Sequence, residues 1–161
     1  IHCMCIREIK IEDNSQIESV IKSTFKELGL PLVGTAYEDI ETTRMYESYQ
    51  EQKSIYFVIE EEGLVKGGGG IKSLSSADNG VCELQKMYFS VDLRGKGYGQ
   101  KLLSVCLDAA QKMGYTHCYL ETLSELKKAL KLYKYNDFKN LNTPMGQTGH
   151  TSCGIWMLKT I

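Results

Sequence analysis

Several features that define other protein classes are scarce in this sequence. Only two of its 161 residues are proline, its net charge at pH 7 is −1, and apolar runs such as residues 55–59 are far too short to cross a bilayer. Because charges of both signs are scattered along the chain, we expect neither a nucleic-acid nor a membrane partner. No basic-then-apolar leader opens the sequence, which favours a cytoplasmic protein.

Cysteine occurs six times, but its spacing fits neither a disulfide framework nor a zinc site, so free thiols and no bound metal are expected. Cys3 and Cys5 are separated by a single residue, and the other cysteines are isolated. Cys82, Cys106 and Cys118 lie in apolar stretches, where a thiol packs as a small buried hydrophobe.

The length and continuity of the chain predict one domain over residues 1–161. No internal repeat, low-complexity tract or linker divides it. Hydrophobic residues make up 42% of the composition, which is typical of an ordinary globular protein with its own core.

Hydrophobic periodicity predicts alternating strands and helices. Residues 5–11 are predicted as a strand, and the helix that follows is capped by Asp13 or Asn14 and stops at Gly29. Residues 37–52 are predicted as a second helix. The remaining expected elements are strands at residues 54–60, 64–73 and 81–91, a loop at 75–80, a helix ending at Gly114, a strand at 117–122, a helix at about 124–135, and a final pair of strands, the second at 153–159.

The strand, helix and strand over residues 81–122 form a crossover, which makes the two strands parallel. The N-terminus of the crossover helix then lies at the carboxyl end of the first strand, a common place for anionic ligands. The fold class is α/β, or α+β by stricter labels, with helices on both faces of a mixed sheet.

Three alternate glycines, Gly95, Gly97 and Gly99, lie between the end of a strand and the start of an amphipathic helix. Without Cβ atoms, such a backbone can direct several N–H groups toward one anion. The helix dipole and the charges of Arg94 and Lys96 add to this attraction. A pyrophosphate would suit the loop.

Other interpretations of this glycine loop fit less well. A P-loop would end in Gly-Lys-Ser/Thr, which is absent, and a Rossmann loop follows the first strand of a parallel set, whereas antiparallel strands come first here. A flexible turn without function is the third alternative.

The segment from Arg94 to Gly99 fits the pattern Arg/Gln-x-x-Gly-x-Gly/Ala, and in this the sequence resembles the GNAT superfamily of acyl-CoA-dependent N-acyltransferases. Residues 83–89 before the loop, and residues 129–133 followed by Phe138, match as well. The resemblance implies a mixed, mostly antiparallel central sheet of about six or seven strands flanked by about four helices. It also implies acetyl-CoA as acyl donor and an amine as acceptor.

By the same resemblance, backbone amides of residues 95–100 hold the pyrophosphate, and backbone groups of Met87 and Phe89 pair with the pantetheine arm and the acetyl carbonyl. The implied cofactor-binding residues are Met87, Tyr88, Phe89, Arg94, Gly95, Lys96, Gly97, Tyr98, Gly99 and Gln100.

The sequence departs from the family pattern at three positions. Val91 replaces a frequent proline, and Leu126 replaces an asparagine that contacts the pantetheine in many members. Asp137 replaces a glycine, and we expect it to end its helix because Asp tolerates left-handed conformations. Within the superfamily, the sequence resembles a subgroup of small bacterial acetyltransferases with no assigned substrate, in the run Gly67–Gly70, in residues 82–88 and in the tail at residues 148–153.

Attack of an amine on a thioester requires a neutral nucleophile and a proton for the departing thiolate. Tyr133 aligns with the general acid of many members, and Glu83 lies near the position of their base. The alternatives are core packing for Tyr133 and a solvated carboxylate for Glu83. Glu121 and His150 are competing bases, and Gly67–Gly70 indicates a close approach of backbone or ligand.

The predicted reaction is a direct transfer in a ternary complex, because no cysteine has a paired histidine. A catalytically silent coenzyme A sensor or interaction module is the alternative. The identity of the amine, in a small molecule or a peptide, stays open, as does the choice between monomer and homodimer.

Overall fold

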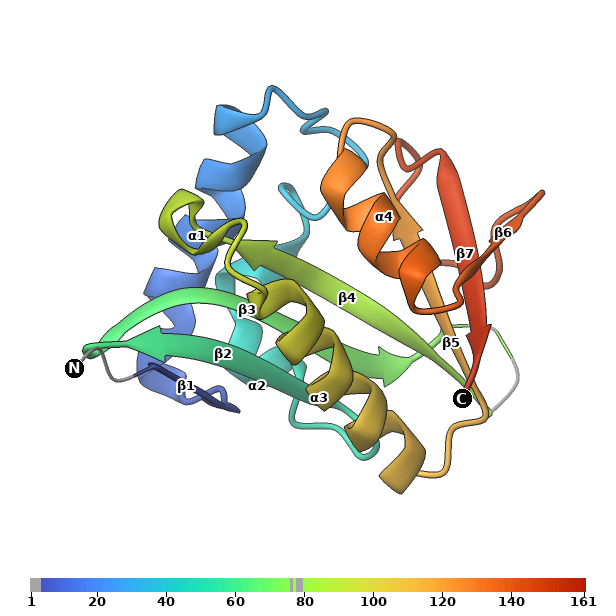
Figure 1. Cartoon of the computed structure of the whole chain (residues 1–161), viewed down its shortest axis with the longest axis horizontal. Helices are drawn as coiled ribbons and strands as arrows, with labels where there is room; N and C mark the ends of the chain where they lie inside the picture. Colours follow the sequence, from blue (N-terminus) through green and yellow to red (C-terminus); the bar gives the residue numbers. More distant parts are fainter. Residues whose placement is uncertain (1–3, 76, 78–79) are drawn as a thin grey trace.

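The computed structural model describes residues 4–75, 77 and 80–161. Seven strands form one sheet in the order β1-β2-β3-β4-β5-β7-β6 (Figure 1). Only β4 and β5 are parallel neighbours among these, so the predicted mixed, mostly antiparallel sheet is confirmed. The strands are β1 (Met4–Glu8), β2 (Ile55–Glu61), β3 (Leu64–Ser73), β4 (Val81–Phe89), β5 (His117–Thr122), β6 (Lys139–Leu141) and β7 (Ile155–Thr160).

The helices are α1 (Asn14–Glu27), α2 (Met45–Ser48), α3 (Tyr98–Lys112) and α4 (Lys127–Tyr135), and they cover both faces of the sheet (Figure 1). Leu102 and Cys106 of α3 belong to one apolar core with the sheet, and Ile17 and Phe25 of α1 belong to a second core. None of the helices that the structure describes is long and apolar enough to cross a membrane.

The cysteines of the described residues are free thiols, as predicted, and Cys3 lies outside those residues. Cys82, Cys106 and Cys118 are completely buried, so they pack as small apolar side chains.

The helix predicted at residues 37–52 is wrong. A 3-10 turn at Ile40–Thr43 and the single turn of α2 occupy this segment, and Arg44 between them has φ −140° and ψ 51°, which is not helical. The Asn14 side chain also accepts a hydrogen bond from the backbone N–H of Tyr46 at 2.7 Å. Contacts with α1 therefore override the local helical pattern.

The other predicted elements are in place. The strands predicted at residues 64–73 and 117–122 have the expected bounds, whereas some other elements are shorter because turns replace their ends. The first strand stops at Glu8, a 3-10 turn at Val91–Leu93 follows β4, and α4 begins at Lys127. Asp137 adopts the left-handed φ of 67° two residues after the end of α4, as expected for the residue that ends this helix. In the predicted loop at residues 75–80, residues 76, 78 and 79 lie outside the described residues.

The glycine run of β3 makes room for an aromatic side chain of β2. A Cβ atom at Gly68 or Gly70 would lie 2.6 Å from atoms of the Tyr56 ring. The Tyr56 hydroxyl donates a hydrogen bond of 2.7 Å to the carbonyl oxygen of Lys86, which has the left-handed φ of 49°. The β3–β4 register shifts at this point, so Tyr56 supports a bulge in β4.

Candidate active site

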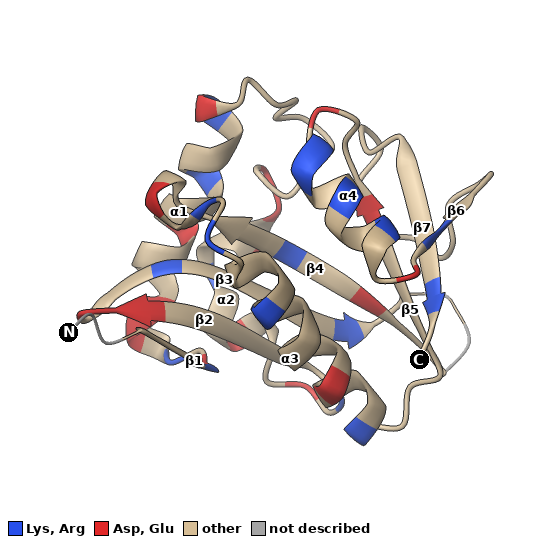
Figure 2. Cartoon of the chain, viewed as in Figure 1, with Lys and Arg blue, Asp and Glu red and all other residues tan. Residues whose placement is uncertain are grey.

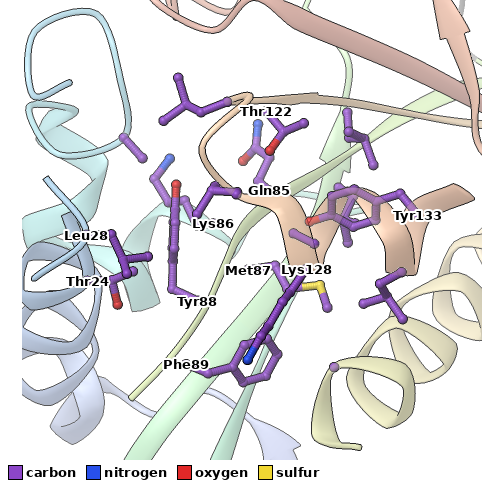
Figure 3. A pocket seen from close by; sticks show the side chains of 18 of the residues that line it. Thr24, Leu28, Gln85, Lys86, Met87, Tyr88, Phe89, Thr122, Lys128 and Tyr133 are labelled. Carbon is purple, nitrogen blue, oxygen red and sulfur yellow. The ribbon is translucent and has the colours of Figure 1, made fainter. Parts of the chain in front are cut away.

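A cavity of about 640 Å³ lies where β4 and β5 separate. The two strands pair only from Val81 to Glu83 of β4, and beyond that point β4 keeps β3 as its neighbour. Backbone groups on the open edge of β4 can therefore pair with an extended ligand. The cavity is also lined by the glycine loop and the first turns of α3 and α4 (Figure 3).

The glycine loop has the backbone conformation that its sequence predicts. Gly95 has φ 76° and Gly97, the N-cap of α3, has φ 83°, and both are left-handed values that favour glycine. No atom lies within 4 Å of a Cβ built at either residue, so the space in front of the loop is open. All of the predicted cofactor-binding residues line the cavity except Lys96.

Arg94 supports the loop through its side chain. Its guanidinium donates to the carbonyl oxygen of Phe89 at 2.9 Å and forms an ion pair with Glu27 of α1 at 2.5 Å. The Arg94 charge is therefore already paired, and this side chain ties the end of β4 to α1. Lysines gather instead on α4 (Figure 2), where Lys127 and Lys128 line the cavity.

Tyr133 of α4 is 7% exposed, and its ring packs edge-on against Phe138 with 5.8 Å between ring centroids. Its hydroxyl points into the cavity (Figure 3). Burial raises the pKa of this phenol, so it keeps its proton at neutral pH. Tyr133 is thus a core residue whose protonated hydroxyl faces the cavity.

Glu83 of β4 also lines the cavity and is only 3% exposed. Burial raises its pKa to about 7, while a hydrogen bond donated by the Gln85 amide opposes this rise. The solvated alternative for Glu83 is wrong, since its carboxylate is buried. A carboxylate that titrates near neutral pH can accept a proton and release it again.

Glu121 of β5 and His150 line the cavity beside Glu83. Glu121 accepts hydrogen bonds from the hydroxyls of Tyr119, at 2.6 Å, and Thr148. The Nδ1 atom of His150 is 3.9 Å from an oxygen of Glu121. Glu121 therefore accepts hydrogen bonds from two side-chain hydroxyls, whereas Glu83 accepts one from the Gln85 amide.

The other ring nitrogen of His150, Nε2, contacts Asp39 at 2.6 Å. Asp39 also contacts the Lys86 Nζ atom at 3.2 Å, so one carboxylate joins three distant parts of the chain. Sequence reasoning missed Asp39, which belongs to no motif, and Lys86, which lies in the matching segment at residues 83–89 but has no role assigned there. The buried lysine at a bulge is visible only in the folded chain.

The charges of this cluster support one another. Burial raises the pKa of Asp39, but the hydrogen bond from His150 and the charge of Lys86 outweigh it, and the net pKa is lowered. Burial likewise lowers the pKa of His150, and the bond to Asp39 overcomes this, so the net pKa is raised. Both shifts favour the ionised pair.

The whole chain resembles known acetyltransferases. An uncharacterized N-acetyltransferase of Escherichia coli (strain K12), YjgM, is 38% identical over 157 residues, which cover 97% of this chain and 94% of that protein. An acetyltransferase of the GNAT family from Staphylococcus aureus Mu50 superposes with a TM-score of 0.87 at 16% identity, over 98% of this chain and 99% of that chain.

A third relative was solved with a bound molecule. YncA of Salmonella typhimurium, a putative acetyltransferase whose structure contains its cofactor acetyl-CoA, superposes with a TM-score of 0.77 at 23% identity, over 98% of this chain and 94% of that chain. The sequence model of the Acetyltransferase (GNAT) family matches residues 21–138 of this chain. This chain therefore belongs to the GNAT family of acetyltransferases.

Proposed function

We propose that this chain moves the acetyl group of acetyl-CoA to a primary amine, by direct attack while both substrates are bound. We further propose that residues 1–161 form one acyl-CoA N-acyltransferase domain. The observation that carries it is the cavity between β4 and β5, which is lined by the glycine loop and by two buried acid–base groups, Glu83 and Tyr133.

The residues of the cavity fit acetyl-CoA. The open, left-handed backbone at Gly95 and Gly97 suits a pyrophosphate, and the unpaired edge of β4 suits the amide groups of a pantetheine arm. Lys127 and Lys128 add positive charge at the mouth. The acetyl-CoA bound to the Salmonella relative supports this assignment.

Acetyl-CoA supplies an activated thioester, and the side chains of this chain move the protons. Glu83, with a pKa of about 7, accepts the proton of the incoming ammonium group and leaves a neutral nucleophile. Tyr133 then donates its proton to the sulfur of the departing thiolate, because burial keeps the phenol protonated. The second proton that the nitrogen loses as it becomes an amide restores the phenol.

A covalent route through cysteine fits the cavity less well. Cys153 lines it, but burial raises the pKa of this thiol to about 12, with further contributions from Glu121 and Glu83. A thiol that keeps its proton is a weak nucleophile. Direct attack by the amine is therefore the favoured reaction.

The donor site is tested by calorimetric titration with acetyl-CoA of the native protein and two variants. Gly97→Glu places bulk and negative charge in the glycine loop, and we expect affinity to fall at least about 100-fold. Gly114→Glu is the matched control, because Gly114 is another left-handed glycine with open space, at the far end of α3. No binding by the folded native protein would overturn the proposal.

The transfer itself is tested by measuring the release of free thiol from acetyl-CoA in the presence of a panel of amines. Tyr133→Phe should leave acetyl-CoA affinity unchanged and lower turnover about 10- to 100-fold, since the variant loses one proton donor. Equal turnover by the two proteins would remove Tyr133 from the mechanism. Acetyl-CoA binding without acetylation of any amine would favour a silent coenzyme A module.

A further inference from the structure

Two side chains that the mechanism does not use form a hydrogen-bonded chain to Glu83. The Tyr49 hydroxyl donates to Oε1 of Gln85 at 2.6 Å, and Nε2 of Gln85 donates to Oε1 of Glu83. Glu83 and Gln85 are two residues apart on β4, so they lie on the same face of the sheet. Tyr49 follows α2, far away in the sequence.

The direction of this chain follows from what each group can donate. A glutamine amide has one oxygen, which accepts, and one nitrogen, which donates. Burial raises the pKa of Tyr49 well above its usual value, so its hydroxyl stays protonated and donates to the amide oxygen. When Glu83 is ionised, the amide nitrogen faces it, since the reverse orientation would place the amide oxygen against a carboxylate oxygen.

The glycine run of β3 makes this contact possible. Gly70 pairs with Gln85 across the sheet, and a Cβ atom at Gly70 would lie 3.1 Å from the Tyr49 ring and 2.6 Å from the Tyr56 ring. Without a side chain at this position, the Tyr49 ring, which is 3% exposed, reaches over β3 to Gln85. The glycine run thus contributes to the active site.

We propose that Gln85 and Tyr49 are positioning residues, with Gln85 donating a hydrogen bond that orients the Glu83 carboxylate and Tyr49 fixing the Gln85 amide. This inference rests on the proposed function, in which Glu83 is the base. It extends the functional site to the segment before β2.

The chain of hydrogen bonds also affects the proton affinity of Glu83. Burial is the main reason that its pKa is raised, and the Gln85 amide is the largest influence in the opposite direction. Loss of that donor therefore favours the protonated carboxyl, which cannot act as a base. The other titratable groups around Glu83 and Tyr49 are Lys72 of β3, which pairs with Glu83 across the sheet and lies 4.9 Å from the centre of the Tyr49 ring, Glu121 and Tyr119 of β5, His150 and Cys153 before β7, Lys86 of β4, Tyr56 of β2, and Asp39 and Glu41 before α2.

The test follows the titration of Glu83 directly by carbon-13 NMR of protein labelled at glutamate side-chain carboxyls. Glu83→Gln identifies the signal by its loss. In Gln85→Met, which keeps the volume but removes the amide, the midpoint should rise by about one pH unit. In Tyr49→Phe, which keeps Gln85 in place, it should rise by a smaller amount.

Two variants serve as controls. Tyr46→Phe removes another hydroxyl from the same region, and Gln50→Met removes an amide that hydrogen-bonds the Tyr46 carbonyl oxygen. Both should leave the Glu83 midpoint unchanged. Unchanged midpoints in both Gln85→Met and Tyr49→Phe, with native circular dichroism, would overturn the inference.

A second readout separates this inference from the proposed function. With an amine that the panel identifies, the acidic limb of kcat/KM should move to higher pH in Gln85→Met, in step with the NMR midpoint. Full activity of Glu83→Gln would reject Glu83 as the base, even if the NMR titration shows the hydrogen bond. Loss of activity in Glu83→Gln without any shift in Gln85→Met would reject the positioning residues alone.

Discussion

The two sides of the cavity are built in different ways. The proposed acetyl-CoA side is formed largely by one continuous stretch, residues 87–100, in which the end of β4, a 3-10 turn and the glycine loop lead into α3. The opposite side brings together Asp39, Glu83, Glu121 and His150 from separate segments. A site made of consecutive backbone can be found in a sequence, whereas a site made of distant side chains appears only in the fold.

The two sides also differ in how their charges are held. The lysines of α4 lie around the cavity mouth, whereas on the other side Lys86, with a side chain that is 2% exposed, contacts Asp39 at 3.2 Å and Glu41 at 3.5 Å. Unpairing a buried charge is far more costly than changing a solvated one. Substitutions on the side of Lys86 should therefore affect stability as well as activity.

The largest effect is expected for Lys86→Met, which removes the buried cation between two carboxylates. We expect a loss of about 3 kcal/mol in the free energy of unfolding, measured by urea denaturation. Lys72→Met is the control, because Lys72 contacts Glu41 at 3.1 Å but its side chain is more exposed, at 14%. The control should lose less than about 1 kcal/mol. Equal losses in the two variants would show that burial does not distinguish these ion pairs.

The two sides of the cavity also differ in how far the sequence predicts their structure. The loop from Arg94 to Gly99 was predictable because the φ angles of its glycines and the start of α3 are set within a few residues. The supposed helix at residues 37–52 was not, because a side chain of α1 caps Tyr46 and Arg44 breaks the helical backbone. Glu83 was proposed from its place on the strand, but its burial and its bond to Gln85 depend on packing.

An intermediate effect is expected within the glycine run, where two neighbouring residues of β3 differ in their surroundings. In Gly68→Ala the new Cβ atom would meet the Tyr56 ring at 2.6 Å and the Phe57 carbonyl oxygen at 2.9 Å. In Gly69→Ala its neighbours are side-chain atoms of Leu102 and Met87 at 3.2 and 3.3 Å, which can move.

We therefore expect Gly68→Ala to lose about 2 kcal/mol of stability and Gly69→Ala less than about 1 kcal/mol, by urea denaturation. Gly68→Ala should also weaken acetyl-CoA binding, because Tyr56 supports the β4 bulge through the Lys86 carbonyl oxygen. Such a result would show that the acetyl-CoA side depends on a distant contact as well. Equal losses in the two variants would contradict the assigned role of Tyr56.

The smallest effect concerns His150, whose pair with Asp39 should make stability depend on pH. Because the folded-state pKa of His150 is raised above its ordinary value of 6.5, the pair contributes fully below that value and is lost as pH rises through the folded-state pKa. Asp39 stays ionised over this range, since its pKa is lowered.

His150→Gln should therefore lower the free energy of unfolding by about 1 kcal/mol near pH 6, and the difference from the native protein should shrink toward pH 9. Urea denaturation of both proteins across this range measures it. Glu83 also titrates there and the charge of His150 lowers its pKa, so the same comparison is made in a Glu83→Gln background, where this contribution is absent. His117→Gln, which alters a histidine beside Thr116 and outside the cavity, is the control. A difference between native protein and His150→Gln that stays constant with pH would mean that the His150–Asp39 contact does not depend on the charge of the imidazole.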